Sequence, residues 1–396
     1  MPGPLAGLRV LDLSRVLAGP ICSMLLGDLG ADVLKVEQPG VGDETRTWGP
    51  PFTRGESAYF LAINRNKRSL TLNLKDARGL ALLGQLAQAS DILLQNFRPG
   101  TLARLGLGYA EAARLNGRLI YASLTAYGST GPGAAKPGYD FIAQGVGGLM
   151  SITGWPDGPP TKVGVAVVDV VAGLLLTGLV LAALHRRERT GRGEEVETSL
   201  LQAAVALLVN AASNYLVSGE TPGRWGNAHP NIVPYQTFAT ADGHLNVAIA
   251  NDNLWRSFCQ VLGEPAWAVH PDYATNADRI RNRERLVALL GARFAAQPTA
   301  VWLGRLEAAG LPCGPVNTVA EVLADPAVRH LKMVQEVEHP TLGPIRLLGI
   351  PFTVAGSPPR IRRPPPRLGE HTEEVLGEVL GLEPPEVEGL RREGVV

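Results

Sequence analysis

The sequence lacks the features that mark several large classes of protein. Its 396 residues include 37 Lys and Arg and 37 Asp and Glu, so the formal net charge is +0. A general nucleic-acid binder needs a basic face, and this balance argues against one while leaving room for a local basic pocket. No internal period of the kind that marks solenoids or propellers is present. The composition therefore favours an ordinary globular protein with one or more large cores.

Cysteine is also scarce, with three residues at Cys22, Cys259 and Cys313. Their separation offers neither a disulfide framework nor a zinc-binding pattern, and no two histidines stand at a metal-ligand spacing. The opening "MPGPLAGLRVLDLSRV" has no basic segment followed by an apolar one, as a signal peptide would. These features predict a cytoplasmic protein without a bound metal.

A glycine fingerprint is missing as well. The first expected strand–helix turn reads "SRVLAGPICSMLLG", which does not contain G-x-G-x-x-G. This disfavours a nicotinamide dehydrogenase, because that fingerprint lets the backbone approach the pyrophosphate of the dinucleotide. It does not exclude another cofactor that carries a nucleotide.

Long hydrophobic runs are rare too, and the strongest one contains a carboxylate. The run "KVGVAVVDVVAGLLLTGLVLAAL" spans 162–184, with Asp169 inside it. Three explanations compete: a membrane span, a helix whose start is capped by Asp169, and a nucleophile at a buried helix terminus. The length suits a span. However, Asp169 and the interspersed glycines favour a buried helix, and the milder run at 200–219 predicts another one.

The flanking residues place Asp169 near the start of that helix. The segment before it is short and rich in β-branched residues, whereas "HRRER" follows the apolar segment and suits a helix C-terminus. An Asp at the beginning of a helix is often a simple N-cap. From position alone, the choice between a cap and a nucleophile stays open.

The first half of the chain alternates strand-like and helical segments. Strands are expected at 8–14, 31–37, 68–74, 91–97 and 119–128, and helices at 19–30 and 76–90. This alternation predicts an α/β fold with a mostly parallel sheet and with ligands at the carboxyl ends of its strands.

The second half changes in character. Residues 1–205 are expected to form the first part of a large domain, followed by a Gly- and Pro-rich linker at 206–234. A small domain is expected at 235–325, with a hairpin about Asp242 and Gly243 and two following helices. A second linker at 326–352 would lead back to the large domain at 353–396.

Several motifs taken together resemble one family. They are "LDLSRVLAGPICSMLLGDLGADVLKVEQPGVGDETR", "NRNKRSLTLNLK", "QNFRPG", "GYDFIAQGVGGLMSITGWPDGPPTKVGVAVVD" and "ALHRRERTGRGEEVETSLL". In this order and at these separations they resemble the family III CoA-transferases, which include formyl-CoA and carnitine CoA-transferases. The resemblance is densest over 8–205 and resumes near 366–376. It implies a Rossmann-like large domain built from both chain ends, a smaller α+β middle domain, and a homodimer whose protomers interlock like rings.

The resemblance also implies a role for Asp169, which falls at the family's catalytic aspartate. An acyl-CoA and a small carboxylic acid would then be the substrates, with no permanently bound cofactor. A carboxylate with an ordinary pKa near 3.9 is ionised at neutral pH and can attack a thioester. The expected intermediates are an aspartyl anhydride and an aspartyl-CoA thioester. Backbone amides and a helix N-terminus can stabilise the oxyanions that form.

CoA carries a diphosphate, a 3′-phosphate and an adenine ring, so cations and amides should follow its path. By motif, the resemblance implies that CoA is bound by Ala18, Gln38, Leu72, Asn73, Leu74, Lys75, Asn96, Phe97, Arg98, Arg104, Lys136, Pro137, Gly138, Tyr139 and Asp140. Other interpretations remain for some of them. Phe97 could be a core residue, and Lys75 or Arg104 could simply be solvated. Asp140 could orient the site or cap a helix.

The chain departs from the family pattern in three places. Gln38 stands where formyl-CoA members often have Arg, so one phosphate contact is in doubt. "QNFRPG" replaces the more usual "ENFRPG". "AIANDNLWRSF" replaces a glycine-rich loop of the small domain, which disfavours oxalate and formate and points to a dicarboxylate or similar acid.

Two other functions compete with CoA transfer. An α-methylacyl-CoA racemase needs two acid–base groups, and the family's racemases have a His-Asp pair where this chain has Tyr139 and Asp140. A CoA-binding protein without chemistry would have no need for Asp169.

Overall fold

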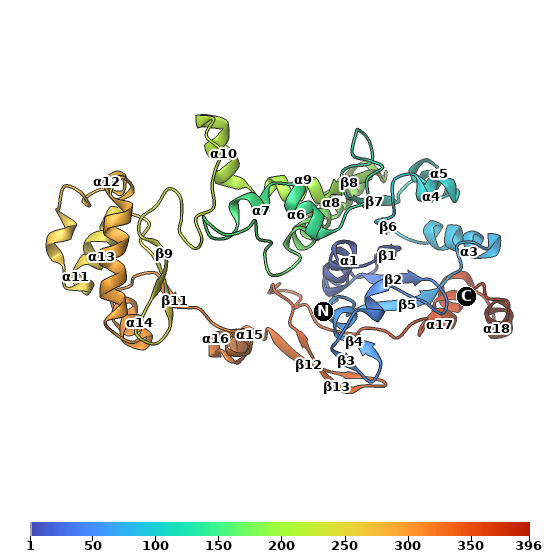
Figure 1. The fold of residues 1–396 in the computed structure, drawn as a ribbon. Coiled ribbons are helices and arrows are strands. Elements are labelled where there is room, and N and C mark those ends of the chain that lie inside the picture. Colours follow the sequence, from blue (N-terminus) through green and yellow to red (C-terminus); the bar gives the residue numbers. More distant parts are fainter. Residues whose placement is uncertain (1) are drawn as a thin grey trace. The chain divides into compact units, whose positions relative to one another are not determined.

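The computed structural model describes residues 2–396, which form two compact units (Figure 1). The large unit consists of Met1–Leu149, Val163–Asn210 and Pro326–Val396. The small unit consists of Met150–Lys162 and Ala211–Asp325. Both ends of the chain therefore contribute to the large unit.

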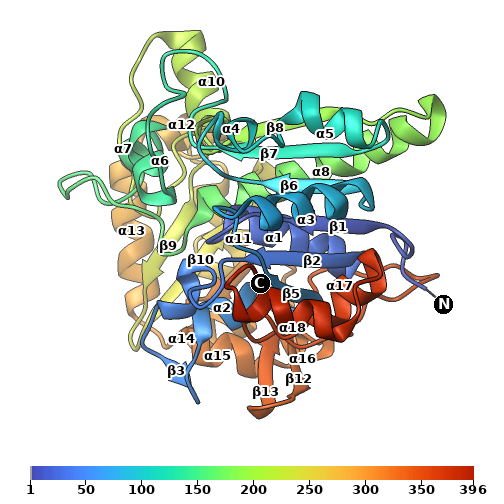
Figure 2. The same ribbon diagram turned by 90° about the vertical axis from the view of Figure 1, so that its right-hand side faces the viewer.

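A parallel sheet forms the centre of the large unit. Its six strands run in the order β5-β2-β1-β6-β7-β8, and Figure 2 shows β6, β1, β2 and β5 side by side. The strands are β1 (Arg9–Asp12), β2 (Asp32–Glu37), β5 (Lys67–Thr71), β6 (Ile92–Gln95), β7 (Ile120–Thr125) and β8 (Glu195–Ser199). All neighbours pair in parallel, with Leu11 opposite Leu34 on one side and Leu93 on the other. These leucines are fully buried, as expected for a sheet covered on both faces.

The predicted alternation of strands and helices is confirmed, and local signals fix the helix ends. Asp76 caps α3 (Ala77–Gln88) by accepting the Arg78 amide at 2.9 Å. Gly191, at φ +71°, ends α8 (Val167–Thr190) in the left-handed conformation that glycine favours. The other helices that begin in the large unit are α1 (Ala18–Asp28), α2 (Ala58–Ile63), α4 (Thr101–Arg104), α5 (Tyr109–Leu115), α6 (Asp140–Val146), α7 (Leu149–Ile152), α9 (Leu200–Ala206), α10 (Val209–Ser218), α16 (Pro326–His330), α17 (Thr372–Leu380) and α18 (Pro384–Arg392).

Helix α8 is long and apolar enough to cross a membrane by length and composition alone. In the large unit, however, one of its faces is buried and packs against α1. Arg187 in its last turn is also buried, and its guanidinium donates to Asp91 at 3.0 Å. A second face exposes Leu174, Leu175 and Leu179.

The C-terminal segment completes the large unit beside β5. The His371 amide donates to the Ser69 carbonyl at 2.8 Å, and the Asn73 amide donates to the Val395 carbonyl at the same distance. Figure 2 shows α17 and α18 next to this edge of the sheet. The unit also contains two short antiparallel hairpins, β3 (Phe52–Thr53) with β4 (Glu56–Ser57) and β12 (Val334–His339) with β13 (Gly343–Leu348), and the 3₁₀ helix η1 (Glu44–Thr47).

The small unit has its own sheet and core. Strands β9 (Tyr235–Ala239), β10 (His244–Ala248) and β11 (Cys313–Pro315) pair antiparallel in the order β11-β10-β9. The turn between β9 and β10 contains Asp242 and Gly243, which confirms the predicted hairpin. The helices are α11 (Asp252–Leu262), α12 (Asn276–Arg281), α13 (Arg283–Ala295), α14 (Thr299–Ala308) and α15 (Val319–Ala324), with the 3₁₀ helix η2 (Pro265–Ala268).

The structure differs from what the sequence predicts in three respects. Strand β8 was not expected. The single buried helix predicted over 200–219 is wrong, because the chain breaks between α9 and α10 near Val209 (φ +37°), and α10 buries none of its residues. The expected linkers also contain regular structure: 206–234 includes α10, and 326–352 includes the β12–β13 hairpin.

Candidate active site

Asp169 lies in the first turn of α8, three residues after the N-cap Ala166. Its side chain is nearly buried, with 7% of the residue exposed. Within residues 2–396 no group hydrogen bonds to its carboxylate. Asp169 is therefore not the cap of α8, and a buried carboxylate without partners needs another explanation.

The capping residue is Asp140, the first residue of α6. One of its carboxylate oxygens accepts the backbone amides of Val168 at 2.8 Å and of Asp169 at 3.2 Å. The other accepts the Gln144 side-chain amide at 2.6 Å. Gln144 in turn accepts the Val163 amide at 2.8 Å. Asp140 thus caps α8 and ties its start to α6, which confirms the capping role among the two left open for it.

Burial and the neighbouring carboxylate of Asp140 change the ionisation of Asp169. Burial, and secondly the nearby charge of Asp140, raise the pKa of Asp169 to about 7. The expectation of a carboxylate fully ionised at neutral pH, based on an ordinary pKa, is therefore wrong. Near pH 7 the protonated and ionised forms are both populated.

The start of α1 lies against the same part of α8. A Cβ atom at Gly173 would come within 2.6 Å of the Ala18 carbonyl oxygen, so only glycine permits this approach. Asp169 is four residues before Gly173 and shares its helix face. The N-cap Leu17 gives α1 no capping side chain. The amides of Ala18 and Gly19 are thus available, because a helix leaves its first amides unpaired, whereas Pro20 has no N–H.

A cavity of about 310 Å³ opens beside Asp169. Nine predicted site residues line it: Ala18, Asn96, Phe97, Arg98, Lys136, Pro137, Gly138, Tyr139 and Asp169. The Asn96 side chain is already engaged, since it accepts the Arg15 amide at 2.9 Å and donates to the Arg15 carbonyl at 2.8 Å. Asn96 thus holds the turn before α1 and keeps one N–H and one oxygen lone pair for a ligand.

A second cavity of about 330 Å³ lies in the large unit as well. The predicted residues that line it are Gln38, Leu72, Asn73, Leu74, Lys75 and Phe97. Arg15 and Phe97 line both cavities, and the Arg15 guanidinium lies 5.3 Å from the centre of the Phe97 ring. The two cavities therefore share a boundary made by this pair.

Unpaired cations face both cavities. Within the described part of the chain, no acceptor binds the side chains of Arg98 and Lys136 at the first cavity or of Lys75 at the second. Arg104 differs, because it lines neither cavity and its guanidinium donates to Thr101 at 3.1 Å. Of the predicted site, only Arg104 and Asp140 lie outside the two cavity linings.

Three residues near the site were not predicted. Arg15 lines both cavities and pairs with Glu44 at 3.5 Å. Asp43 binds the backbone before α1. Burial and the charges of Asp169, Asp140 and Asp43 raise the pKa of Tyr59 to about 12, so its hydroxyl keeps its proton. The position of Arg15 directly after a strand was the one available signal, because ligands gather at strand ends.

Across residues 2–396, no three His, Cys, Asp or Glu side chains come together in a way that could hold a metal ion. What the site offers is a free carboxylate, helix amides and unpaired cations.

Comparison with known proteins identifies the class of enzyme. The succinyl-CoA:glutarate CoA-transferase of Mus musculus is 44% identical over 393 residues, covering 99% of this chain and 90% of the relative. The succinate–glutarate CoA-transferase of Agrobacterium fabrum is 43% identical over 389 residues, covering 96% of both. The crystal structure of a CaiB/BaiF family protein from Brucella suis matches with a TM-score of 0.84 and 41% identity, over 96% of this chain and 100% of that chain.

The family profile of CoA-transferase family III matches residues 5–372. The protein is thus a transferase that acts on acyl-CoA. It belongs to CoA-transferase family III.

Proposed function

We propose that this enzyme transfers CoA from succinyl-CoA to glutarate or a closely similar dicarboxylate, with Asp169 as the nucleophile. The observation that carries the proposal is the buried, unpartnered Asp169 carboxylate at a cavity lined by unpaired cations. The substrate pair is supported by the two transferases that are 43–44% identical and are named for succinate and glutarate.

In the proposed reaction, the ionised Asp169 carboxylate attacks the thioester carbonyl of the donor. The C–S bond breaks, CoA leaves as a thiolate, and a mixed anhydride forms. The thiolate then attacks the aspartyl carbonyl, which releases the donor acid and gives an aspartyl-CoA thioester. The acceptor carboxylate repeats these steps in reverse. Each step passes through an oxyanion, and the free amides at the start of α1 are suitable donors to it.

The two cavities suit the two ends of CoA. Lys75, Arg98 and Lys136 have no protein acceptor among residues 2–396, so phosphate groups can bind them without displacing an ion pair. The other predicted contacts line the same two cavities, with two exceptions. Asp140 acts through Asp169 rather than on CoA, and Arg104 reaches CoA only if its side chain turns away from Thr101.

We also propose that the protein works as an interlocked homodimer in the cytoplasm. The exposed apolar face of α8, with Leu174, Leu175 and Leu179, supports an interface there. The three free cysteines fit a reducing compartment. Sedimentation at decreasing concentration should give dimers throughout, and a folded monomer peak would contradict the interlocking.

The central test is transfer itself. Purified protein given succinyl-CoA and glutarate should form glutaryl-CoA, detected by mass spectrometry, whereas Asp169→Asn should not. With glutarate labelled with ¹⁸O, label should appear on the peptide that contains Asp169, because the bridging anhydride oxygen stays with the protein. Label on another carboxylate, or turnover by Asp169→Asn, would refute the assignment.

A further inference from the structure

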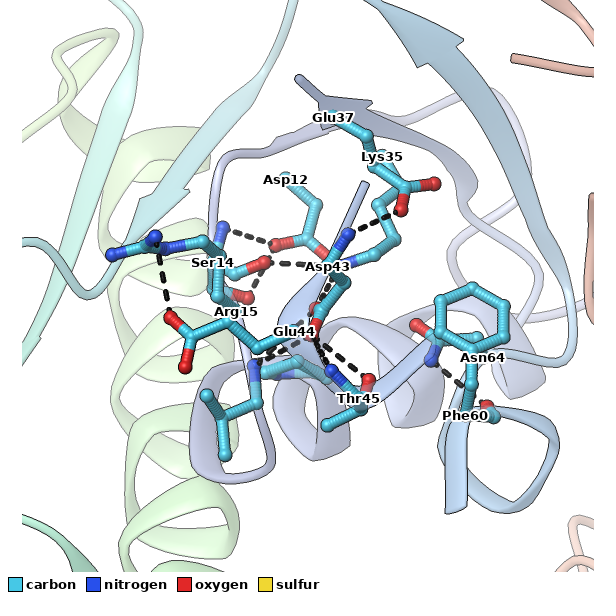
Figure 3. A network of polar contacts seen from close by, with 12 residues as sticks. Asp12, Ser14, Arg15, Lys35, Glu37, Asp43, Glu44, Thr45, Phe60 and Asn64 are labelled. Atoms are coloured by element: carbon cyan, nitrogen blue, oxygen red, sulfur yellow. Dashed lines mark hydrogen bonds and ion pairs between the residues drawn. The ribbon is translucent and has the colours of Figure 1, made fainter. Parts of the chain in front are cut away.

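The turn between β1 and α1, Ser14–Leu17, contains a residue in a costly conformation. Val16 has φ +69°, a left-handed value that a β-branched residue rarely adopts. Such a conformation persists only where the surroundings fix it. The Val16 amide donates to both carboxylate oxygens of Asp43, at 3.3 Å each, and Figure 3 shows Asp43 next to this turn. Asp43 is therefore the group that holds Val16.

Asp43 is itself held firmly. It is 2% exposed, and its carboxylate pairs at 2.8 Å with the Lys35 ammonium, which is fully buried. Although burial opposes its ionisation, Lys35 and then Thr45 lower the pKa of Asp43 to about 2. Lys35 also donates to the Ser14 carbonyl at 3.0 Å. The two partners of one buried ion pair thus hold two points of the same turn, Lys35 at Ser14 and Asp43 at Val16.

This turn lies next to the proposed nucleophile. Val16 packs against the same buried apolar cluster, which includes Leu17 and Ile21 of the α1 region, as Ala166 and Val170, which stand on either side of Asp169 in the sequence. Val16 and Leu17 also line the cavity of Asp169. A shift of Val16 would therefore move the start of α1 relative to the Asp169 carboxylate.

We propose that Asp43, paired with Lys35, is a positioning residue for CoA transfer: it fixes the Val16 turn and thereby directs the first amides of α1 towards the oxyanion that forms at Asp169. This inference rests on the proposed function. It also gives the buried Lys35–Asp43 ion pair a purpose other than stability. Buried ion pairs contribute little net stability compared with apolar residues of the same size.

The test compares Asp43 with a matched acid at the other end of α1. Asp28 is equally buried and pairs with Arg65 at 2.6 Å, but it does not contact the turn. In Asp43→Ala we expect kcat to fall about 10²-fold, the usual loss when an oxyanion donor is removed. KM for acyl-CoA should stay within threefold. Asp43→Asn keeps an oxygen for the Val16 amide, so it should regain part of kcat. Asp28→Ala should keep kcat.

Hydrogen exchange gives a readout that does not depend on activity. The amides of the peptide covering Ser14–Leu17 should exchange faster in Asp43→Ala than in the native enzyme or in Asp28→Ala. Faster exchange with a native kcat would overturn the positioning role, as would equal losses of kcat in the Asp43 and Asp28 variants. If Asp43→Ala does not fold, the same comparison applies to Asp43→Asn. A native enzyme without any transfer would instead refute the proposed function.

Discussion

The Asp169→Asn variant should gain stability over the native protein as the pH rises, because burial and the charge of Asp140 disfavour the ionised carboxylate of native Asp169. Its pKa is raised to about 7 in the folded protein from an ordinary value of 3.8. Between these two values the folded state binds a proton that the unfolded state has lost. Native stability therefore decreases as the pH rises through this window. The cost reaches its full size once Asp169 is ionised, above about pH 7.

The magnitude follows from the shift in pKa. At 1.36 kcal/mol per unit, a rise from 3.8 to about 7 corresponds to roughly 4 kcal/mol. Asparagine has the same shape without the charge, and the native carboxylate has no hydrogen bond that the variant would lose. For a chain of 396 residues, an unfolding entropy of about 2 cal/mol/K per residue converts this into a melting-temperature gain on the order of 5 °C.

The assay is thermal unfolding of both proteins from pH 4 to pH 8. The difference in melting temperature should be small and constant near pH 4, grow between pH 4 and 7, and level off above. Asp76→Asn is the control, because Arg78 lowers the pKa of Asp76 and its removal should bring no such gain. A difference that does not change with pH would show that Asp169 ionises normally and would refute the reasoning.

The remaining predictions concern activity. Below about pH 7, kcat/KM for the acyl-CoA should fall about tenfold per pH unit, since in the proposed reaction only the ionised Asp169 attacks the thioester. A decrease in initial-rate measurements that begins only near pH 4 would contradict this. Lys75→Ala should raise KM for acyl-CoA about tenfold with little change in kcat, and Arg104→Ala should raise it less, because Arg104 lines neither cavity. Equal increases in KM for the two variants in steady-state kinetics would contradict this prediction. A 2-methylacyl-CoA incubated in deuterated water should keep its α-hydrogen, because Tyr139 stands where racemases have His; deuterium uptake measured by mass spectrometry would favour the racemase instead.

Local patterns were enough to predict the framework of the large unit. Buried apolar runs between turn residues indicated β1, β2, β6 and β7, and each strand was found within its expected range. The hairpin between β9 and β10 was predictable from its turn residues, although the chain reverses at Ala241 and Asp242, one residue before the predicted pair: the Thr240 amide donates to the Gly243 carbonyl at 2.9 Å. Such signals depend on neighbouring residues in the sequence, so they can be recognised without knowledge of the tertiary structure.

The chemistry of the site depends on residues far apart in the chain and could not be predicted in this way. The motif located Asp169, but its raised pKa comes from burial and from Asp140, 29 positions earlier. Likewise, the cap of α8 comes from α6 rather than from its own first turn. The pairing of Lys35 with Asp43 and their hold on the turn before α1 leave no periodic trace in the sequence.

The contrast between Asp140 and Asp169 has a consequence for the proposed reaction. Asp140 accepts three hydrogen bonds, two of them from backbone amides at the positive end of α8, which stabilise its charge. Asp169 accepts none, so its negative charge is opposed by burial and by Asp140 together. Forming the anhydride converts Asp169 into a neutral acyl group and removes that repulsion. Part of the free energy that destabilises the ionised resting enzyme is thereby released as the first bond forms, which lowers the barrier to acylation.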